Sequence, residues 1–263
     1  MIQPPVAFSY IVKETVRLSF FIAGLLGALL TGAAMAGPPF VTDDPEPVES
    51  GHWEVYIASE RAQGIEGVSG TAPHVEVNYG ALPEMQLHVI APLAYAGTVG
   101  GPWHSGFGDT ELGMKYRFLD ETDSHPQIGT FPLLELPTGN ETPGLGGGHT
   151  QAFLPVWLQK SFGSWTTYGG GGYRLNPGIG NQNYWLVGWE VQRRLSTSFA
   201  AGIEFFRTTA VTPRGDPSFS FNVGTMLDLS EEHHILFSAG RDLSGPNRFT
   251  AYLAFQWTLG PQR

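Results

Sequence analysis

Charged side chains recur at alternate positions within apolar stretches of this 263-residue chain. Lys115 alternates with Met114 and Tyr116, and Glu190 alternates with Trp189 and Val191. Successive side chains of a strand point to opposite faces, so the pattern predicts that the charges share one face of a sheet. The residues placed on that face are Glu54, Glu76, Lys115, Arg117, Glu135, Glu190 and Glu204. Such charges can form an ion-pair network or a polar constriction that filters a solute, and the sequence leaves both open.

Four consecutive glycines, Gly169, Gly170, Gly171 and Gly172, interrupt a predicted strand. A strand without side chains either bends sharply or lets another group pack against its bare backbone. A bulky residue from the adjoining strand, such as Phe153 or Trp157, could fill that space. A solute path along the glycines is the functional alternative, so these four positions join the candidate site.

Residue types and spacing in the sequence give little support for a catalytic or metal-binding site. The chain has no cysteine, and its eight histidines show no ligand spacing. A lipid hydrolase would need Ser and His side by side with an orienting group. No G-x-S-x-G element occurs, although neighbouring predicted strands and turns hold Ser218, Ser220, Asn222 and His234. We expect no enzyme, no cofactor and no bound metal.

Strands must position the candidate residues, and the alternating pattern predicts about twelve of them, each of roughly ten residues. In residues 185–191 the odd positions are Trp or Val, and the even positions include Gly and Glu. The predicted strands are centred near Val55, Val77, Val89, Met114, Leu133, Val156, Tyr168, Val187, Ile203, Val223, Phe237 and Leu253.

The connections decide between a soluble sandwich and a membrane barrel. Short links near residues 81–84, 120–125, 162–164, 194–197 and 230–233 alternate with mostly longer, Gly- and Pro-rich links. Outer-membrane barrels have short turns at one end and longer loops at the other. We therefore predict one antiparallel transmembrane β-barrel over residues 51–263. Aromatic residues near strand ends, Trp53, Trp165, Tyr184 and Trp257, fit interfacial girdles.

Residues 1–36 have the pattern of a cleavable signal peptide, with Lys13 and Arg17 before an apolar run that ends in Ala34-Met35-Ala36. Residues 37–50 are dense in Pro and Asp and are expected to be a periplasmic lead-in. The formal net charge of -10 argues against a nucleic-acid partner.

Five segments spread over nearly the whole exported chain carry a family resemblance. They are PPFVTDDPEPVESGHWEVY (38–56), GFGDTELGMKYRFLDE (106–121), LPTG (136–139), GGGGYRLNPG (169–178) and SAGRD with FTAYLAFQW (238–257). With these segments the chain resembles the family named for the meta-pathway of phenol degradation, described as outer-membrane transporter-like barrels. The resemblance implies an outer-membrane location and, through the name, a link to aromatic catabolism. It implies no catalytic or binding residues.

The resulting expectation is an exported barrel in the outer membrane of a Gram-negative-type cell. We expect it to act as a passive channel for small, aromatic or otherwise hydrophobic molecules. The alternatives are a structural or surface-binding barrel without transport and, less favoured, a lipid hydrolase. Expected partners are outer-membrane lipid, the barrel-assembly machinery and a small solute. The sequence does not fix the number of copies or say whether the lumen is open.

Overall fold

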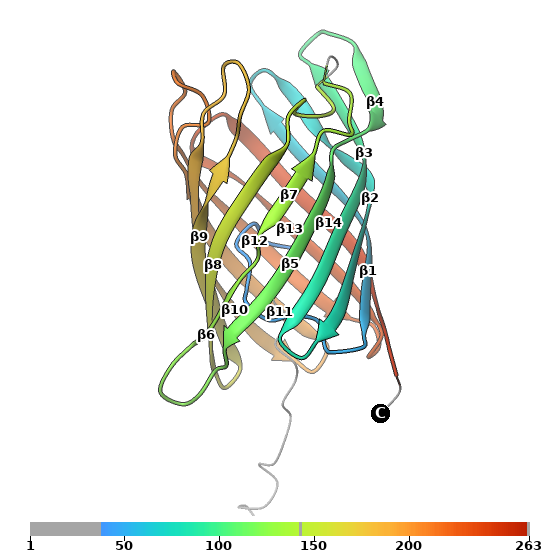
Figure 1. Ribbon diagram of the computed structural model, residues 1–263, viewed down its shortest axis with the longest axis vertical. Helices are drawn as coiled ribbons and strands as arrows, with labels where there is room; N and C mark the ends of the chain where they lie inside the picture. The colour runs from blue at the N-terminus through green and yellow to red at the C-terminus, as the bar shows by residue number, and fades with distance from the viewer. Residues whose placement is uncertain (1–37, 142–143, 262–263) are drawn as a thin grey trace, which may run out of the picture. The chain divides into compact units, whose positions relative to one another are not determined.

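The alternating segments form the wall of a closed antiparallel β-barrel in the computed structural model, which describes residues 38–141 and 144–261 (Figure 1). The barrel lies in a compact unit, Ala34–Arg263. The other unit, Met1–Ala33, lies outside the described residues, and so does the predicted signal peptide at 1–36. No helix in the described ranges is long and apolar enough to cross a membrane.

The described residues contain fourteen strand segments. They are β1 (Trp53–Gly64), β2 (Gly67–Leu82), β3 (Met85–Thr98), β4 (Trp103–Phe107), β5 (Thr110–Leu119), β6 (Gln127–Thr130), β7 (Leu133–Leu136), β8 (Gln151–Phe162), β9 (Trp165–Leu175), β10 (Tyr184–Ser196), β11 (Phe199–Thr208), β12 (Ser218–Asp228), β13 (His233–Ser244) and β14 (Asn247–Leu259).

Pairing between β1 and β14 closes the sheet, with Trp53 opposite Leu259. Two strands of the wall are interrupted. β4 and β5 both pair with β3, and β6 and β7 both lie between β5 and β8. The described segments therefore make twelve strands, and each of the twelve predicted centres falls in a different one. The prediction of an antiparallel barrel of about twelve strands is confirmed.

The interruptions have local causes. Phe131 and Pro132 separate β6 from β7, and a proline has no N–H to give to a ladder. Gly108 and Asp109 separate β4 from β5, and the Asp109 carboxylate accepts the N–H of Gly139 from a loop. In both places the wall bends without losing its order of strands.

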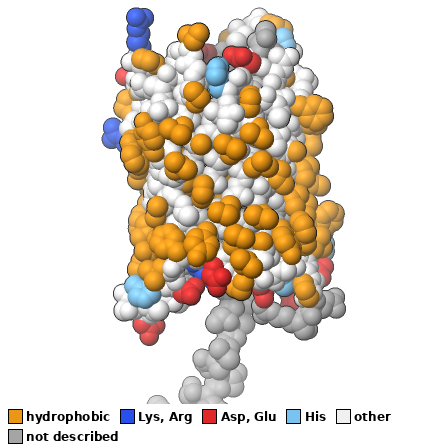
Figure 2. All heavy atoms as spheres, in the orientation of Figure 1, with side chains coloured by type: hydrophobic (Ala, Val, Ile, Leu, Met, Phe, Trp, Pro, Cys, Tyr) orange, Lys and Arg blue, Asp and Glu red, His pale blue; other side chains and the backbone are white. Residues whose placement is uncertain are grey.

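One face of each strand points outward and carries a continuous apolar surface. On β10, Trp185, Val187 and Trp189 are 53%, 54% and 51% exposed. The alternate residues Gly188, Glu190 and Gln192 are buried and face the interior. Figure 2 shows apolar side chains spread over a broad band on the visible face of the barrel, with most charged groups near its two ends. This is the arrangement of a transmembrane barrel, with an apolar exterior and a polar lumen.

Connections at one end of the barrel are short, and we call this the short-turn end. It holds the C-terminal end of β14 (Figure 1). At the opposite, long-loop end, residues 137–150, 176–183 and 209–217 connect strands. The sequence predicts longer links at residues 64–70, 97–106 and 241–246, but these stretches are mostly strand. The reason is that β2 begins at Gly67, β4 covers Trp103–Phe107 and β13 continues to Ser244. Their backbone groups are satisfied by pairing beyond the apolar band, for example between Gly67 and Thr98.

The girdle prediction needs one correction. Trp53, Trp165 and Trp257 are exposed near the short-turn end of their strands. Tyr184 instead shares the inner face of β10 with Glu190, as its position in the alternation requires.

Candidate functional site

Residues 38–50 lie inside the barrel, and we call them the lumenal segment. The Pro39 carbonyl accepts a hydrogen bond of 2.5 Å from the Ser238 hydroxyl on β13. The N–H groups of Val41 and Thr42 donate to the Glu204 carboxylate on β11, at 2.9 and 2.8 Å. Farther along, the Val48 N–H donates to Gln86 on β3 at 2.9 Å. Because β11 and β3 are on well-separated parts of the wall, the segment crosses the lumen.

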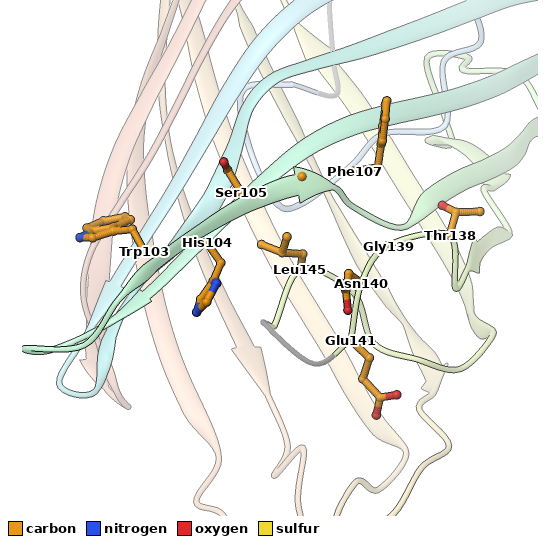
Figure 3. Close-up of a pocket in the computed structure, with 10 residues that line it drawn as sticks. Trp103, His104, Ser105, Phe107, Thr138, Gly139, Asn140, Glu141 and Leu145 are labelled. Carbon is orange, nitrogen blue, oxygen red and sulfur yellow. The ribbon is translucent and has the colours of Figure 1, made fainter.

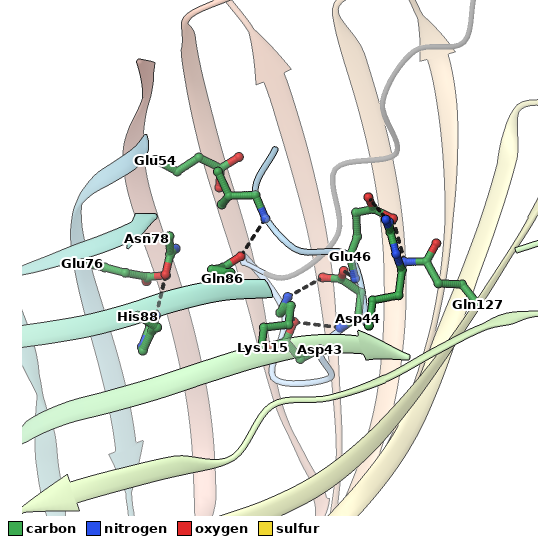
Figure 4. Close-up of polar contacts among 12 residues, drawn as sticks. Asp43, Asp44, Glu46, Glu54, Glu76, Asn78, Gln86, His88, Lys115 and Gln127 are labelled. Carbon is green, nitrogen blue, oxygen red and sulfur yellow. Dashed lines mark hydrogen bonds and ion pairs between the residues drawn. The ribbon is translucent and has the colours of Figure 1, made fainter. Parts of the chain in front are cut away.

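Two cations of β5 hold the middle of the lumenal segment. The Lys115 ammonium lies 3.0 Å from Asp43 and 3.3 Å from Asp44 (Figure 4). The Arg117 guanidinium lies 2.7 Å from Glu46, which also accepts 2.6 Å from the Gln127 amide. Asp44 is fully buried. Burial raises the pKa of the Asp44 carboxyl well above its ordinary value, although the Lys115 charge acts in the opposite direction.

The lead-in expected at residues 37–50 precedes the first strand, but its described residues occupy the lumen and do not extend outside the barrel. Sequence reasoning missed Asp43, Asp44 and Glu46 as site residues for this reason. The sequence feature that could have identified them is a group of three carboxylates within four positions. The predicted lumen face carries two cations, Lys115 and Arg117, with which they could pair. Opposite charges that leave water together must pair, so this match could have located the segment.

Two carboxylates face each other in the opposite wall. Glu190 on β10 is the Cα partner of Glu204 on β11, and both side chains are fully buried. Glu204 receives the lumenal segment and also the Asn222 amide at 2.6 Å. Neither Glu190 carboxylate oxygen has a hydrogen-bond partner among the described residues. The structure therefore places Glu190 and Glu204 side by side, and neither of them forms an ion pair with Lys115 or Arg117.

The remaining predicted charges lie in separate contacts on the lumen face. Glu54 accepts from the Tyr56 hydroxyl at 2.6 Å. Glu76 accepts from Asn78 at 2.8 Å, in a group that includes His88 (Figure 4). Glu135 pairs with Arg174 at 3.2 Å toward the long-loop end. All seven predicted charges thus face the lumen. Their part in a solute path stays a prediction.

Aromatic side chains cover part of the inner wall between β6 and β8. Phe131, Phe153 and Trp157 form one buried cluster. Cations stand at both of its ends, with the Lys115 ammonium 5.1 Å from the Phe131 ring centre and the Arg174 guanidinium 5.3 Å from that of Phe153. The cluster is thus a buried apolar part of the inner wall with a cation beside each end.

The glycine run lies beside this cluster. Trp157 is the Cα partner of Gly170, and its side chain is only 1% exposed, so the predicted bulky inward neighbour is present. On the outer side, Trp189 lies against Gly169, where an added Cβ would come within 2.3 Å of the indole. Large side chains thus approach bare backbone from both faces.

We expect Gly170→Val to destabilise the barrel. Gly170 has a φ of +146°, and an added Cβ would lie 2.1 Å from the Val156 carbonyl oxygen. The conformational strain alone is worth about 1–3 kcal/mol. The midpoint of urea unfolding in detergent measures the effect. Gly163→Ala is the control, because Gly163 also has a positive φ but no neighbour within 4 Å. Equal losses in the two variants would contradict this packing role.

A cavity of about 890 Å³ opens at the long-loop end, between β4 and the described parts of the loop at 137–150 (Figure 3). Its lining includes Trp103, His104 and Leu145. Asp109 fixes the loop by accepting the N–H groups of Gly139 and Gly147, at 2.8 and 2.6 Å. The volume of the cavity is in the range of pockets that hold small molecules.

The residues considered for a hydrolase face other partners. The Ser220 hydroxyl donates to Asp242 at 2.7 Å, and the His234 ring lies 2.9 Å from Asp228. Asn222 donates to Glu204, and Ser218 contacts Thr208 at 2.7 Å. The geometry therefore brings no serine of this set to His234.

The exposed apolar band, the closed wall and the polar lumen define a β-barrel of the outer-membrane type. The family model described as "Putative MetA-pathway of phenol degradation" matches residues 77–259. The chain belongs to this family, as its sequence segments predicted.

Solved structures share the fold. An outer membrane channel from Pseudomonas putida F1 superposes with a TM-score of 0.71 at 16% identity, covering 86% of this chain and all of that one. The KdgM porin in complex with disordered oligogalacturonate gives 0.54 at 10% identity, covering 78% of this chain and 98% of the porin. The NanC porin gives 0.54 at 7% identity, covering 79% and 100%. No curated protein matches the chain.

Proposed function

We propose that this protein is a passive channel of the outer membrane for small aromatic or otherwise hydrophobic molecules. The channel and porins with the same fold support the channel part of the proposal. The apolar band supports a place in the bilayer, with the short-turn end in the periplasm and assembly by the barrel-assembly machinery. Residues 1–36 would be the signal peptide that directs export.

One observation carries the proposed solute class. The aromatic cluster of Phe131, Phe153 and Trp157 lies on the lumen face between Lys115 and Arg174. An aromatic ring can stack on such a surface while an attached carboxylate meets a cation. Aromatic acids combine both features and are the solutes to test first.

The test is solute flux into liposomes that carry the refolded chain from Gly37. Benzoate-like acids are compared with sugars of similar size, because neutral phenols cross bilayers unaided. We expect faster uptake of the aromatic acids, and we expect Phe153→Ala to remove much of that preference by deleting the ring beside Arg174. Equal uptake of acids and sugars by the folded protein would refute the proposed solute class.

In this proposal solutes pass when the lumenal segment moves aside, and a disulfide can hold the segment in the lumen. A Cβ built at Gly188 lies 3.2 Å from the Thr42 Cβ, which is slightly shorter than the separation of about 3.5–4.5 Å in disulfides, so the bridge requires only a small outward shift of the segment. We expect oxidised Thr42→Cys/Gly188→Cys protein to lose flux and to regain it on reduction. The chain has no cysteine of its own, so each single variant is a clean control. Flux that is unchanged on oxidation would show that solutes bypass the segment.

A surface-binding barrel is the second candidate, and the fixed loop beside the cavity at the long-loop end favours it. Asp109 holds described residues of this loop over β4. Deleting residues 139–148 should then remove binding of a surface partner without changing permeability. A change in permeability alone would assign the loop to the channel.

A further inference from the structure

Three exposed arginines point outward from the barrel wall: Arg61 on β1, Arg207 on β11 and Arg241 on β13. Each shares the outward face with apolar residues of its own strand, such as Ile57, Phe205 and Phe237. An arginine on this face meets either lipid or the headgroup region. Its level in the wall decides which.

All three arginines lie at one level. Each is eight residues beyond the first residue of its strand, and the three strands run in the same direction from the short-turn end. The strand register supports this. Phe199, the first residue of β11, is paired with Leu227, which is paired with Ile235, the third residue of β13. In the same way His233, the first residue of β13, is paired with Trp257, which is paired with Val55, the third residue of β1. The pairing therefore shifts by the same two residues from β11 to β13 and from β13 to β1. Eight residues of a tilted strand rise about 20 Å, which reaches the outer edge of the apolar band.

The arrangement is confined to one flank. β11, β13 and β1 are successive strands of this direction, about 10 Å apart from one to the next. Two other strands of this direction, β3 and β9, carry the uncharged residues Leu93 and Tyr173 at the same position, eight residues beyond the first residue. The three arginines therefore form an arc on one side of the barrel, which we call the arginine arc.

No member of the arginine arc has an ion pair among the described residues. Arg61 donates to the Gln63 amide oxygen at 3.2 Å, and Arg241 donates to the backbone of Asp242 at 3.3 Å. Phenylalanines lie between them, since Phe219 is opposite Arg207 and Phe221 is opposite Arg241. Unpaired guanidinium groups above an aromatic surface are suited to an amphiphile whose acyl chains meet the rings and whose anionic group meets the cations.

We propose that the arginine arc is a binding site for phosphate groups of a phosphorylated glycolipid in the outer leaflet of the membrane. Guanidinium groups bind phosphate through two parallel hydrogen bonds, which a lysine cannot provide. Arginines about 10 Å apart can hold separate phosphates of one headgroup. The site lies on the outer surface and is separate from the lumen and its proposed solute path.

The probe is bis-phosphorylated lipid A, with its dephosphorylated form as the matched ligand. The refolded chain from Gly37 is placed in nanodiscs with each lipid, and bound lipid is counted by native mass spectrometry after release into detergent. We expect retention of the phosphorylated form only. Arg61→Gln/Arg207→Gln/Arg241→Gln should bind it roughly ten times more weakly, because charge-assisted contacts are lost.

Arg193→Gln is the control variant. Arg193 is also exposed on the outer face, but it lies near the short-turn end, with its guanidinium 5.2 Å from the Trp165 ring centre. We expect this variant to bind lipid A like the unmodified protein. Equal retention of the two lipids, or equal binding by the triple variant, would overturn the proposal. If the triple variant does not fold, the three single variants test the same point. Aromatic-acid flux should be unaffected, which separates this site from the channel.

Discussion

Removing residues 38–50 is expected to open the barrel. The segment crosses the lumen through contacts with Ser238, Glu204, Lys115 and Gln86. A twelve-stranded barrel is intermediate between filled eight-stranded barrels and water-filled ones of sixteen, so we expect ion conductance to rise on the order of tenfold without the segment. Single-channel recording of the refolded chain beginning at Gly51 measures this change.

The control replaces residues 38–50 with a Gly/Ser sequence of equal length. This sequence lacks the carboxylates that meet Lys115 and Arg117, so it should leave the lumen and give the same conductance as the deletion. Low conductance in both variants, with folding verified by heat-modified gel migration, would mean that the wall side chains close the lumen themselves. The oxidised cysteine pair at 42 and 188 is the opposite test, since it prevents release.

Replacing Lys115 with methionine is expected to release the same segment without shortening the chain. Lys115 is 4% exposed and pairs with Asp43 and with the fully buried Asp44. Removing one partner of a buried pair costs about 3–5 kcal/mol, because the other charge remains without compensation. Hydrogen exchange of the Val41, Thr42 and Val48 amides should therefore accelerate roughly 100-fold or more.

Arg174→Met is the matched control for this variant. Arg174 also pairs with a lumen carboxylate, Glu135, but the two side chains are 21% and 26% exposed. Water screens such a pair, and its loss costs about 1 kcal/mol or less. We expect unchanged exchange at Val41 and Thr42. Equal acceleration in both variants would assign the effect to general weakening of the barrel.

The Lys115→Met protein should also respond to pH. Burial already raises the pKa of Asp44, and the loss of the ammonium removes a group that opposed this shift. A carboxyl whose folded-state pKa exceeds its unfolded value stabilises the folded state at low pH and loses that contribution as the pH rises. We therefore expect amide protection to return as the pH falls toward about 4, where the unfolded carboxyl also begins to protonate. Protection that is independent of pH would exclude Asp44 as the cause.

The sequence by itself determined the wall of this protein. Alternation such as Trp185, Val187 and Trp189 against Gly188 and Glu190 specifies both the strand and its faces, because side-chain direction has a period of two. The same rule placed Lys115, Glu190 and Glu204 on the lumen face. Loop lengths were less well determined, because strand pairing extends β2, β4 and β13 through stretches whose Gly and Pro content alone predicts turns.

Only the tertiary structure decided what fills the lumen. Residues 38–50 have no periodic pattern, because each is held by a different strand and not by its neighbours in sequence. Asp44 and Lys115 are 71 residues apart, and Thr42 and Glu204 are 162 apart. Closure of the barrel creates these contacts. The charges at residues 43–46 indicate that the segment needs cationic partners, but they do not specify which strands supply the other contacts. The arginine arc has the same origin, since the level shared by Arg61, Arg207 and Arg241 follows from strand register and tilt.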